Sequence, residues 1–197
     1  IEYIQSNAFQ QCSLLQKVEI PIDSNLKLIS SHSFSETAIE YLSIPSHLQQ
    51  IDDYAFTDCK NLRKIEFAEN SELNRICTEA FSNTSIEKVV APSNLEIIDD
   101  YAFADCKKLK IFEFQSNSEL KSIGEYAFFE SGLACFTIPP LLTEIDEYTF
   151  ANCKKLRIIE IGENTELNYI YKKAFNGCRN IIIMGPVEMI EYVRFYK

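Results

Sequence analysis

Phenylalanine recurs along the chain at intervals that alternate between 25 and 22 residues, so that every second interval closes a period of 47 residues. The series consists of Phe9, Phe34, Phe56, Phe81, Phe103, Phe128, Phe150 and Phe175. Self-similarity at a fixed period of about 20 to 50 residues is the signature of repeat architectures, in which each repeat contacts only its neighbours. The series therefore predicts a solenoid, folded as one elongated domain.

Each turn of the repeat is predicted to contain one short strand. In one long unit Leu62, Ile65 and Phe67 are apolar, whereas Lys64 and Glu66 beside them are polar. This alternation has the period of a strand whose two faces meet different environments. The short unit lacks one residue before the strand and two after it, and both deletions fall in connections. Because apolar residues must stack on their counterparts in neighbouring turns, they set the register of the repeat.

A short helical segment is predicted before each strand. Ala55, Phe56 and Cys59 follow helical spacing, and Asp52 or Asp53 is placed to cap the first turn. A strand and a short helix within one unit are typical of leucine-rich repeats of about 20 to 29 residues. The predicted fold class is therefore α/β: a right-handed leucine-rich-repeat solenoid, or horseshoe segment, with one parallel sheet of about eight short strands and short helical turns on the convex side.

The repeat pattern ends before the last residue of the chain. After Arg179 the alternation fails, and a segment follows in which Ile190 and Val193 are at helical spacing. We therefore predict a leucine-rich-repeat solenoid of alternating 25- and 22-residue units over residues 1–185 and a C-terminal cap over residues 186–197.

Charge and composition exclude several classes of partner. The net charge of −10 repels nucleic acid and anionic membranes at long range and favours a basic or neutral partner. Apolar residues make up 46% of the chain, which suffices for a core. No apolar run approaches the roughly 20 residues that span a bilayer, so no direct membrane insertion of this segment is expected. Two histidines and no tryptophan leave few groups for acid–base or metal chemistry, which is unfavourable for an enzyme.

The pattern Ile-x-x-x-Ala-Phe-x-x-Cys-x-x-Leu-x-x-Ile-x-Ile is carried by residues 51–67, 98–114 and 145–161, and in degraded form by the short units. It resembles the BspA-like, or Treponema-pallidum-type, leucine-rich repeat family over nearly the whole chain. Members of that family occur in bacterial cell-surface proteins and in protist surface-protein families, usually in adhesion and in binding to host or matrix proteins. The resemblance implies partner binding at a cell surface or after secretion, and it transfers no functional residues beyond the core.

Four of the seven cysteines recur with the period of 47 residues: Cys12, Cys59, Cys106 and Cys153. In the turns between them the same column holds Thr37, Thr84 and Ser131. Cysteines two turns apart are separated by about 9.6 Å, beyond the roughly 7 Å limit for a disulfide, so the column predicts small buried side chains. A Cys153–Cys178 bridge between adjacent turns stays an open alternative. Cys77 and Cys135 lie outside the column, and because no zinc-like spacing exists, neither a metal nor another cofactor is expected.

The remaining polar motifs have structural interpretations. Three acidic pairs also recur with the long period: Asp52–Asp53, Asp99–Asp100 and Asp146–Glu147. A separation of about 9.6 Å is too large for the ligands of one calcium ion, so helix capping is their expected role. His32 and His47 match no known catalytic order, so we expect them at the surface and assign no catalytic residue. Asn83 begins a glycosylation sequon, which matters only in a secreted protein.

The outward-facing strand positions are the informative ones, because the core does not dictate them. The first column contains Lys17, Tyr41, Lys64, Lys88, Ile111, Cys135, Ile158 and Ile183; the second contains Glu19, Ser43, Glu66, Val90, Glu113, Thr137, Glu160 and Gly185. Apolar first-column residues beside second-column glutamates have the anatomy of a binding patch. There are simpler explanations for both features. β-Branched residues are common in strands whatever the function of the strand. A ladder of lysines and glutamates also fits a solubilising role. The predicted partner-binding residues are Lys17, Tyr41, Lys64, Glu66, Lys88, Val90, Ile111, Glu113, Thr137, Ile158, Glu160 and Ile183.

We therefore predict a non-enzymatic interaction or adhesion domain that binds a protein partner, such as a host-cell or extracellular-matrix protein, through the concave sheet face. The alternative is a structural spacer or an intracellular scaffold segment of a larger protein, because unpaired thiols fit a reducing compartment at least as well as an oxidising one. Residues 1–9 already match the second half of a repeat, so we expect the natural N-terminus to be absent.

Overall fold

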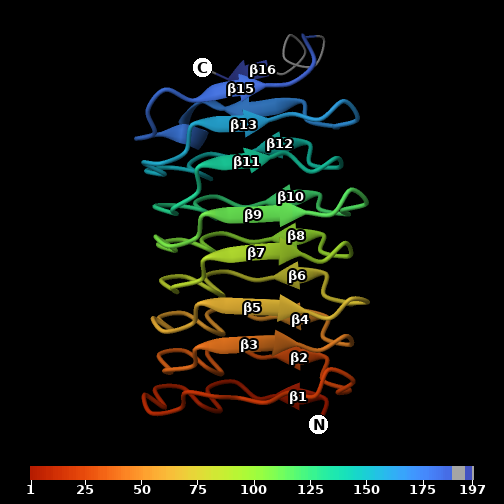
Figure 1. The fold of residues 1–197 in the computed structure, drawn as a ribbon, viewed down its shortest axis with the longest axis vertical. Coiled ribbons are helices and arrows are strands. Elements are labelled where there is room, and N and C mark those ends of the chain that lie inside the picture. Colours follow the sequence, from red (N-terminus) through yellow and green to blue (C-terminus); the bar gives the residue numbers. More distant parts are fainter. Residues whose placement is uncertain (188–193, 197) are drawn as a thin grey trace.

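In a computed structural model that describes residues 1–187 and 194–196, the chain winds into a column of stacked turns, with the two ends of the chain at opposite ends of the column (Figure 1). Each phenylalanine of the series lies in its own turn, and strands of adjoining turns pair in parallel. The solenoid prediction is confirmed.

The longer strands form one side of the column. They are β3 (Tyr41–Ile44), β5 (Lys64–Phe67), β7 (Lys88–Ala91), β9 (Ile111–Phe114), β11 (Cys135–Thr137), β13 (Ile158–Glu160) and β15 (Ile182–Met184). Hydrogen bonds join them in the orders β3-β5-β7-β9 and β11-β13-β15. Within each strand buried and more exposed residues alternate, as the period-two pattern predicts.

A second stack of parallel strands follows another side of the column. Its members are β1 (Tyr3–Ile4), β2 (Leu28–Ile29), β4 (Gln50–Ile51), β6 (Arg75–Ile76), β8 (Ile97–Ile98), β10 (Ser122–Ile123), β12 (Glu144–Ile145), β14 (Tyr169–Tyr171) and β16 (Arg194–Tyr196). The prediction of a single parallel sheet was therefore wrong. Strands of two residues are too short to display an alternation, and each of the first seven sends one isoleucine inward.

The predicted helical segment at residues 52–59 is a series of turns instead. Tyr54 and Asp58 both have a φ of 58°, which a right-handed helix does not allow. The backbone N–H groups of Tyr54, Phe56 and Asp58 donate to the next turn of the column over 2.8–3.0 Å, rather than along a helix. Because pairing between turns already satisfies these groups, no helix is needed. Among the described residues the helical element is the short 3-10 helix η1 (Lys172–Phe175).

The role assigned to the acidic pairs changes with this correction. The Asp53 carboxylate accepts a hydrogen bond from the backbone N–H of Thr78 in the next turn, over 3.1 Å. The Asp52 carboxylate accepts one from the Ser31 hydroxyl in the preceding turn, over 3.1 Å. These aspartates therefore bond adjacent turns to each other instead of capping a helix.

The core is a stack of aromatic rings. Successive phenylalanines from Phe9 to Phe175 have ring centroids 5.1–5.8 Å apart and nearly parallel planes. The rings from Phe34 to Phe150 are fully buried. Each stacked pair contributes about 0.5–1.5 kcal/mol beyond the burial of its area, so the series stabilises one register of the turns over any other.

The column of cysteines at positions 12, 59, 106 and 153, here called the thiol column, also runs along the core. Cys59, Cys106 and Cys153 are buried, and all seven cysteines are free. Cys12 occupies the same position in the first turn, where it is exposed. The Cys178 thiol donates to the Phe150 carbonyl over 3.1 Å instead of bridging to Cys153. The prediction of small, unbridged core side chains is confirmed for the interior turns.

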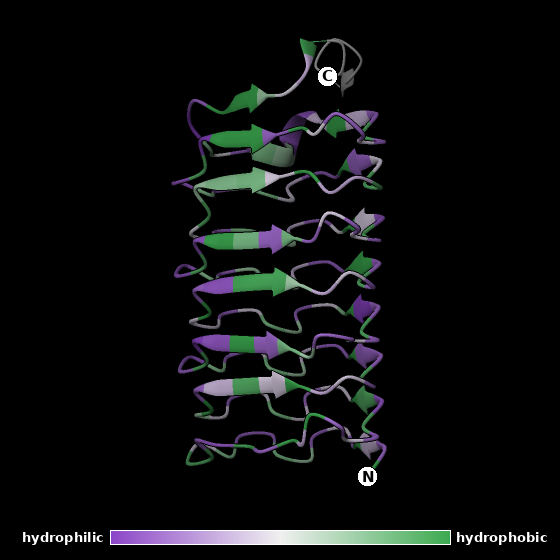
Figure 2. Cartoon of the chain, turned by 45° about the vertical axis from the view of Figure 1, so that its right-hand side comes forward, coloured by the Kyte–Doolittle hydropathy of each residue, from purple (hydrophilic) through white to green (hydrophobic). Residues whose placement is uncertain are grey.

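The column runs straight in both Figure 1 and Figure 2, without the curvature of a horseshoe segment. A solenoid curves when one side of each turn is wider than the opposite side. Here every side consists of strands or turns with little helix, so this difference in width is absent. At the C-terminal end β16 pairs in parallel with β14. The predicted helical spacing of Ile190 and Val193 lies outside the described residues, and the cap over 186–197 stays a prediction.

Candidate protein-binding surface

The outward side chains of β3, β5, β7, β9, β11, β13 and β15, here called the long-strand face, form two columns along the solenoid. Parallel pairing places Tyr41 beside Lys64, and Lys88 beside Ile111. The predicted residues that are exposed on this face are Tyr41, Lys64, Glu66, Lys88, Val90, Ile111, Glu113, Thr137 and Glu160, while Ile158 is half-buried. The structure therefore brings these predicted residues together on one surface.

Ile183 is a predicted binding residue that does not lie on the outer side of its strand. Strand pairing places Ile182 beside Ile158 and Ile183 beside the buried Ile159. Ile183 is half-buried and contacts the core, whereas Ile182 is 57% exposed. The assignment of Ile183 to the outer face was therefore wrong. The connection from Cys178 to the core residue of β15 is one residue shorter than its counterpart one turn earlier, so the register moves by one position.

Lys17 stands at the end of the column. Residues 17–19 form no strand in the part of the chain that the structure describes, although the Gln16 carbonyl accepts a hydrogen bond from the Glu40 N–H over 3.2 Å. The exposed Lys17 ammonium is paired with the Glu19 carboxylate. Lys17 thus continues the first column of outward side chains, but its own segment is not a strand.

The half of the face near the N-terminus is charged and self-paired. The Glu66 carboxylate accepts a hydrogen bond from the Tyr41 hydroxyl over 2.7 Å and is paired with Lys64. The hydrogen bond from Lys64 and, to a smaller extent, that from Tyr41 lower the pKa of the Glu66 carboxyl. Lys88 pairs with Glu113 over 2.8 Å. Because exposed pairs of this kind contribute only about 0–1 kcal/mol each, this ladder fits a solubilising surface.

The other half of the face is apolar. A stripe that we call the apolar patch crosses β9, β11, β13 and β15 and contains Ile111, Cys135, Ile158, Ile182 and Met184. Ile111 is 43% exposed and Met184 is 50% exposed, and Met184 takes the position predicted for Gly185. Figure 2 shows the change along the column, from mixed or hydrophilic long strands near the N-terminus to hydrophobic ones near the C-terminus.

Polar side chains lie along the rim of the apolar patch. The Thr137 hydroxyl donates to the Glu160 carboxylate over 2.8 Å. A hollow of about 270 Å³ opens where β9 and β11 end, and Glu113, Phe114 and Pro139 are among the residues that line it. Apolar side chains with a polar rim and an adjoining hollow are the usual anatomy of a protein-binding surface.

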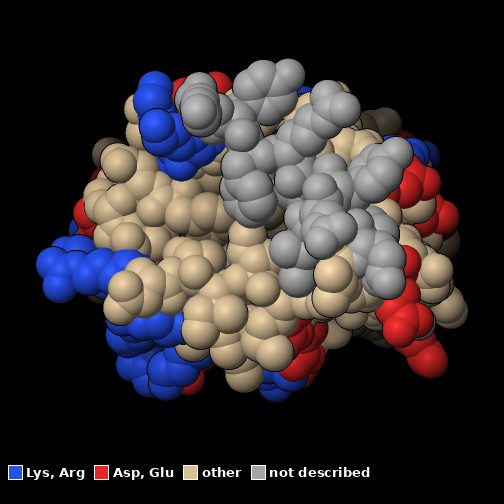
Figure 3. Space-filling view, turned by 90° about the horizontal axis from the view of Figure 1, so that it is seen from above, with Lys and Arg blue, Asp and Glu red and all other residues tan. Residues whose placement is uncertain are grey.

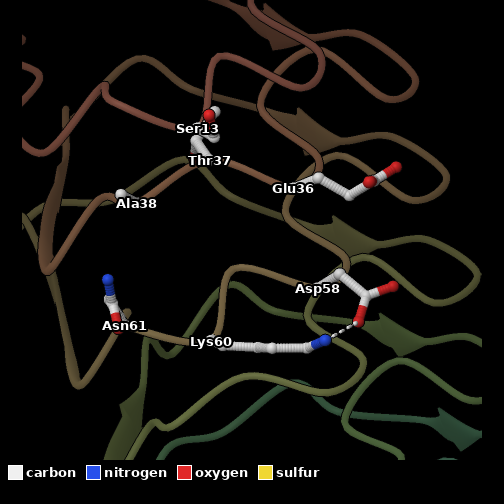
Figure 4. A pocket seen from close by; sticks show the side chains of 7 residues that line it. All are labelled: Ser13, Glu36, Thr37, Ala38, Asp58, Lys60 and Asn61. Atoms are coloured by element: carbon white, nitrogen blue, oxygen red, sulfur yellow. Dashed lines mark ion pairs between the residues drawn. The ribbon is translucent and has the colours of Figure 1, made fainter.

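A second hollow of about 340 Å³ lies on the side of the column where the turns lead into the long strands (Figure 4). Its lining residues are Ser13, Glu36, Thr37, Ala38, Asp58, Lys60 and Asn61. The Lys60 ammonium lies 3.6 Å from the Asp58 carboxylate, and Glu36 accepts a hydrogen bond from Gln11 over 3.2 Å. Its charged groups are therefore held by their neighbours, as on an ordinary solvated edge.

His47 is exposed, as predicted, whereas His32 is half-buried. The His32 ring stacks on the Tyr54 ring with centroids 4.7 Å apart, and the exposed His47 is 2.9 Å from the Glu72 carboxylate. The histidines are therefore engaged by single neighbours and not by a nucleophile.

One cluster with ligand-type atoms was missed in the sequence. Possible ligand atoms of Asp52, Asp53 and Cys77 lie within 4.8 Å of one another, because Cys77 follows β6 in the turn next to the acidic pair. Burial, and then the Asp99 and Asp52 carboxylates, raise the pKa of the Cys77 thiol to about 12. Such a thiol is protonated at neutral pH, whereas metals bind thiolate. Both aspartates already accept hydrogen bonds from neighbouring turns, so the cluster has a structural explanation.

Solved structures with the same architecture come from several bacteria. A leucine-rich repeat protein from Bacteroides ovatus matches with a TM-score of 0.68 and 21% identity, over 99% of this chain and 60% of that one. A Treponema pallidum leucine-rich repeat protein matches at 0.53 and 22%, over 81% and 63%. A protein described as a leucine-rich cell surface protein from Faecalibacterium prausnitzii matches at 0.51 and 19%, over 98% and 72%. At these identities the likeness concerns the fold, and this chain spans less than two thirds of the first two proteins.

Family membership rests on the sequence pattern itself. No curated protein matches the chain. Within residues 1–187 and 194–196 the structure has no helix of the length and apolar character needed to cross a membrane. The family described as BspA type leucine-rich repeat region matches residues 1–110 and 74–197 with six copies, and the chain therefore belongs to the BspA-type leucine-rich repeat family.

Proposed function

We propose that this chain is a non-enzymatic protein-interaction domain that contacts its partner through the long-strand face, with the apolar patch as the main area of contact. The observation that carries the proposal is the line of apolar side chains across consecutive strands, which is exposed at Ile111, Ile182 and Met184 and half-buried at Cys135 and Ile158. Core residues must be apolar in a solenoid, whereas outward residues need not be. An exposed apolar stripe is therefore explained better by an interface than by folding.

Adhesion at a cell surface, to a host-cell or extracellular-matrix protein, is the setting that we propose for this interaction. Membership of the BspA-type family and the description of the Faecalibacterium prausnitzii protein as a cell surface protein support it. The ion pair of Lys64 with Glu66 and the hydrogen bond that the Tyr41 hydroxyl donates to Glu66 support a solubilising role for the other half of the face. The proposed contact therefore lies toward the C-terminal half of the column.

The test compares the wild-type chain with an Ile111→Asp/Ile182→Asp variant. A Leu14→Asp/Ile22→Asp variant is the control, because its two sites are also exposed and apolar but lie outside the long-strand face. Proteins captured from matrix and host-cell extracts are purified, and their dissociation constants are measured by calorimetry against all three chains after matched thermal melts. Buried apolar contacts at the centre of an interface typically contribute more than about 1 kcal/mol each.

The proposal predicts at least about tenfold weaker binding for the patch variant, with the control close to wild type. Equal affinities for the patch variant and wild type would contradict the assignment of the site. The absence of any reproducible partner would favour a structural spacer instead.

A further inference from the structure

One edge of this acidic protein is basic. Segments 60–63, 107–110 and 154–157 contain two, three and three lysines or arginines, and Arg179 adds another, so that these nine are almost half of the 19 in the chain. All nine side chains are exposed, and they lie where the turns lead into the long strands. We call this set the basic edge. Figure 3, a view down the column from its C-terminal end, shows Lys and Arg mainly on one side and Asp and Glu mainly on the other.

The repeat produces this edge. The three segments follow Cys59, Cys106 and Cys153, and are therefore 47 residues, or two turns, apart. Parallel stacking separates equivalent residues by about 4.8 Å per turn, so the basic segments follow one another at intervals of about 9.6 Å. The result is a row of cationic groups parallel to the axis of the column.

The basic edge differs from the rest of the surface in its pairing. Outside it, eight lysines and arginines have described side chains; seven of these form ion pairs with carboxylates, and Lys172 is the exception. On the edge, Lys60 and Lys107 form such pairs, and the other seven have no carboxylate partner among the described residues. Arg157 donates instead to the backbone carbonyls of Lys154 and Leu156. Seven cations of the edge are therefore without an ion pair among the described side chains, although the intervening turns place the exposed Glu40 and Glu87 next to Arg63 and Lys110.

The C-terminal end of the edge is hollowed. A hollow of about 320 Å³ is lined by Lys154, Arg157, Gly177 and Arg179, which include three cations and no carboxylate. A cleft lined by charges of one sign concentrates counter-ions of the other sign. At about 0.15 M salt the Debye length is about 8 Å, so an anion at this edge experiences the nearby cations more than the net charge of −10.

We propose that the basic edge binds a linear anionic polysaccharide, one that carries sulfate or carboxylate groups on its repeating units. A row of evenly spaced cations matches a polymer with evenly spaced anions. A folded acidic protein would need apolar contacts, and of the large apolar residues described as exposed only Leu14 lies on this edge. Single-stranded nucleic acid would need aromatic side chains for base stacking, which segments 60–63, 107–110 and 154–157 lack. This site is separate from the long-strand face and does not depend on the function proposed for it.

The test uses a size-defined heparin oligosaccharide and calorimetric titration at low and at physiological salt. The edge variant is Lys108→Gln/Lys155→Gln/Arg179→Gln. The control is Lys27→Gln/Lys121→Gln/Lys172→Gln, which removes the same charge from two exposed positions and one half-buried position elsewhere. Thermal melts show whether either variant is folded. Each exposed charge contact contributes about a factor of two to three in affinity, so the edge variant should bind about tenfold more weakly than wild type and the control within about twofold.

A loss confined to the edge variant, together with weaker wild-type binding at high salt, is the result expected. Equal affinities of the two variants, or no binding by the wild-type chain, would overturn the proposal. Parallel titrations with single-stranded poly-uridylate and with phosphatidylserine vesicles test the ligand class, and tighter binding of either one than of heparin would overturn the polysaccharide assignment.

Discussion

The thiol of Cys106 donates a hydrogen bond to the carbonyl oxygen of Phe81, one turn earlier in the column, over 3.2 Å. The same sulfur lies 3.2 Å from the Thr84 hydroxyl. Equivalent bonds run from Cys59 to the Phe34 carbonyl and from Cys153 to the Phe128 carbonyl, both over 3.0 Å. The thiol column thus satisfies backbone groups in a core that excludes water.

The first prediction concerns the loss of such a thiol. Cys106→Ala removes a buried donor and leaves a cavity, so the free energy of unfolding should fall by about 2–3 kcal/mol in a denaturant titration. Cys12→Ala, in the same column but exposed at the end turn, should change it by less than about 0.5 kcal/mol. Equal effects of the two substitutions would show that neither the burial nor the hydrogen bond of the Cys106 thiol contributes to stability.

The second prediction concerns alkaline pH. Burial raises the pKa of the Cys106 thiol to about 11 from an ordinary value of 9.0. The pKa of the thiol is higher in the folded state than in the unfolded state. The contribution of the buried thiol to stability is therefore complete below the pKa of the unfolded state and is lost as the pH rises to the pKa of the folded state. Between about pH 8 and pH 11, wild type should therefore lose about 2–3 kcal/mol more stability than Cys106→Ser, in which this titration is absent. Parallel curves for the two proteins in denaturant titrations across this range would contradict it.

The sequence predicts the elements in which side-chain burial alternates. Ile65 and Phe67 could be assigned to a strand because polar residues lie beside them. The phenylalanine and cysteine columns follow from the same logic, since a fixed period in a chain with two unit lengths requires stacking of equivalent residues. These features depend on residue type and spacing alone.

Other elements depend on hydrogen bonds between turns, which spacing does not reveal. Residues 52–59 have apolar residues at helical intervals, yet their N–H groups donate alternately within the turn and to the next turn. The outward position of Ile182 in place of Ile183 was missed because the length of the last connection is visible only once the buried partner of Ile159 is known. The hollow beside Arg157 and Arg179 brings together residues from adjacent turns, so it required the stacked structure.

The third prediction concerns the close approach of two turns at Gly124. A Cβ atom at Gly124 would lie 2.6 Å from the backbone nitrogen of Asp100, one turn earlier. Gly124→Ala should therefore force the turns apart and cost at least about 1–3 kcal/mol of stability in thermal or denaturant unfolding. Gly162→Ala is the matched control, because a Cβ atom there has no neighbour within 4 Å among the described residues, and it should be neutral or slightly stabilising. A Gly124→Ala variant as stable as the control would contradict this arrangement of the turns.

The fourth prediction tests whether the charged half of the long-strand face supports folding. The side chains of Lys88 and Glu113 are about half exposed and 2.8 Å apart, so a double-mutant cycle with alanine at both positions should give a coupling energy of only about 0.2–1 kcal/mol. That coupling should fall further in high salt, because the pair is accessible to counter-ions. A coupling above about 2 kcal/mol that is independent of salt would mean that the ladder holds neighbouring strands together. The exposed lysines and glutamates would then be structural residues, and only the apolar patch would remain free to serve an interface.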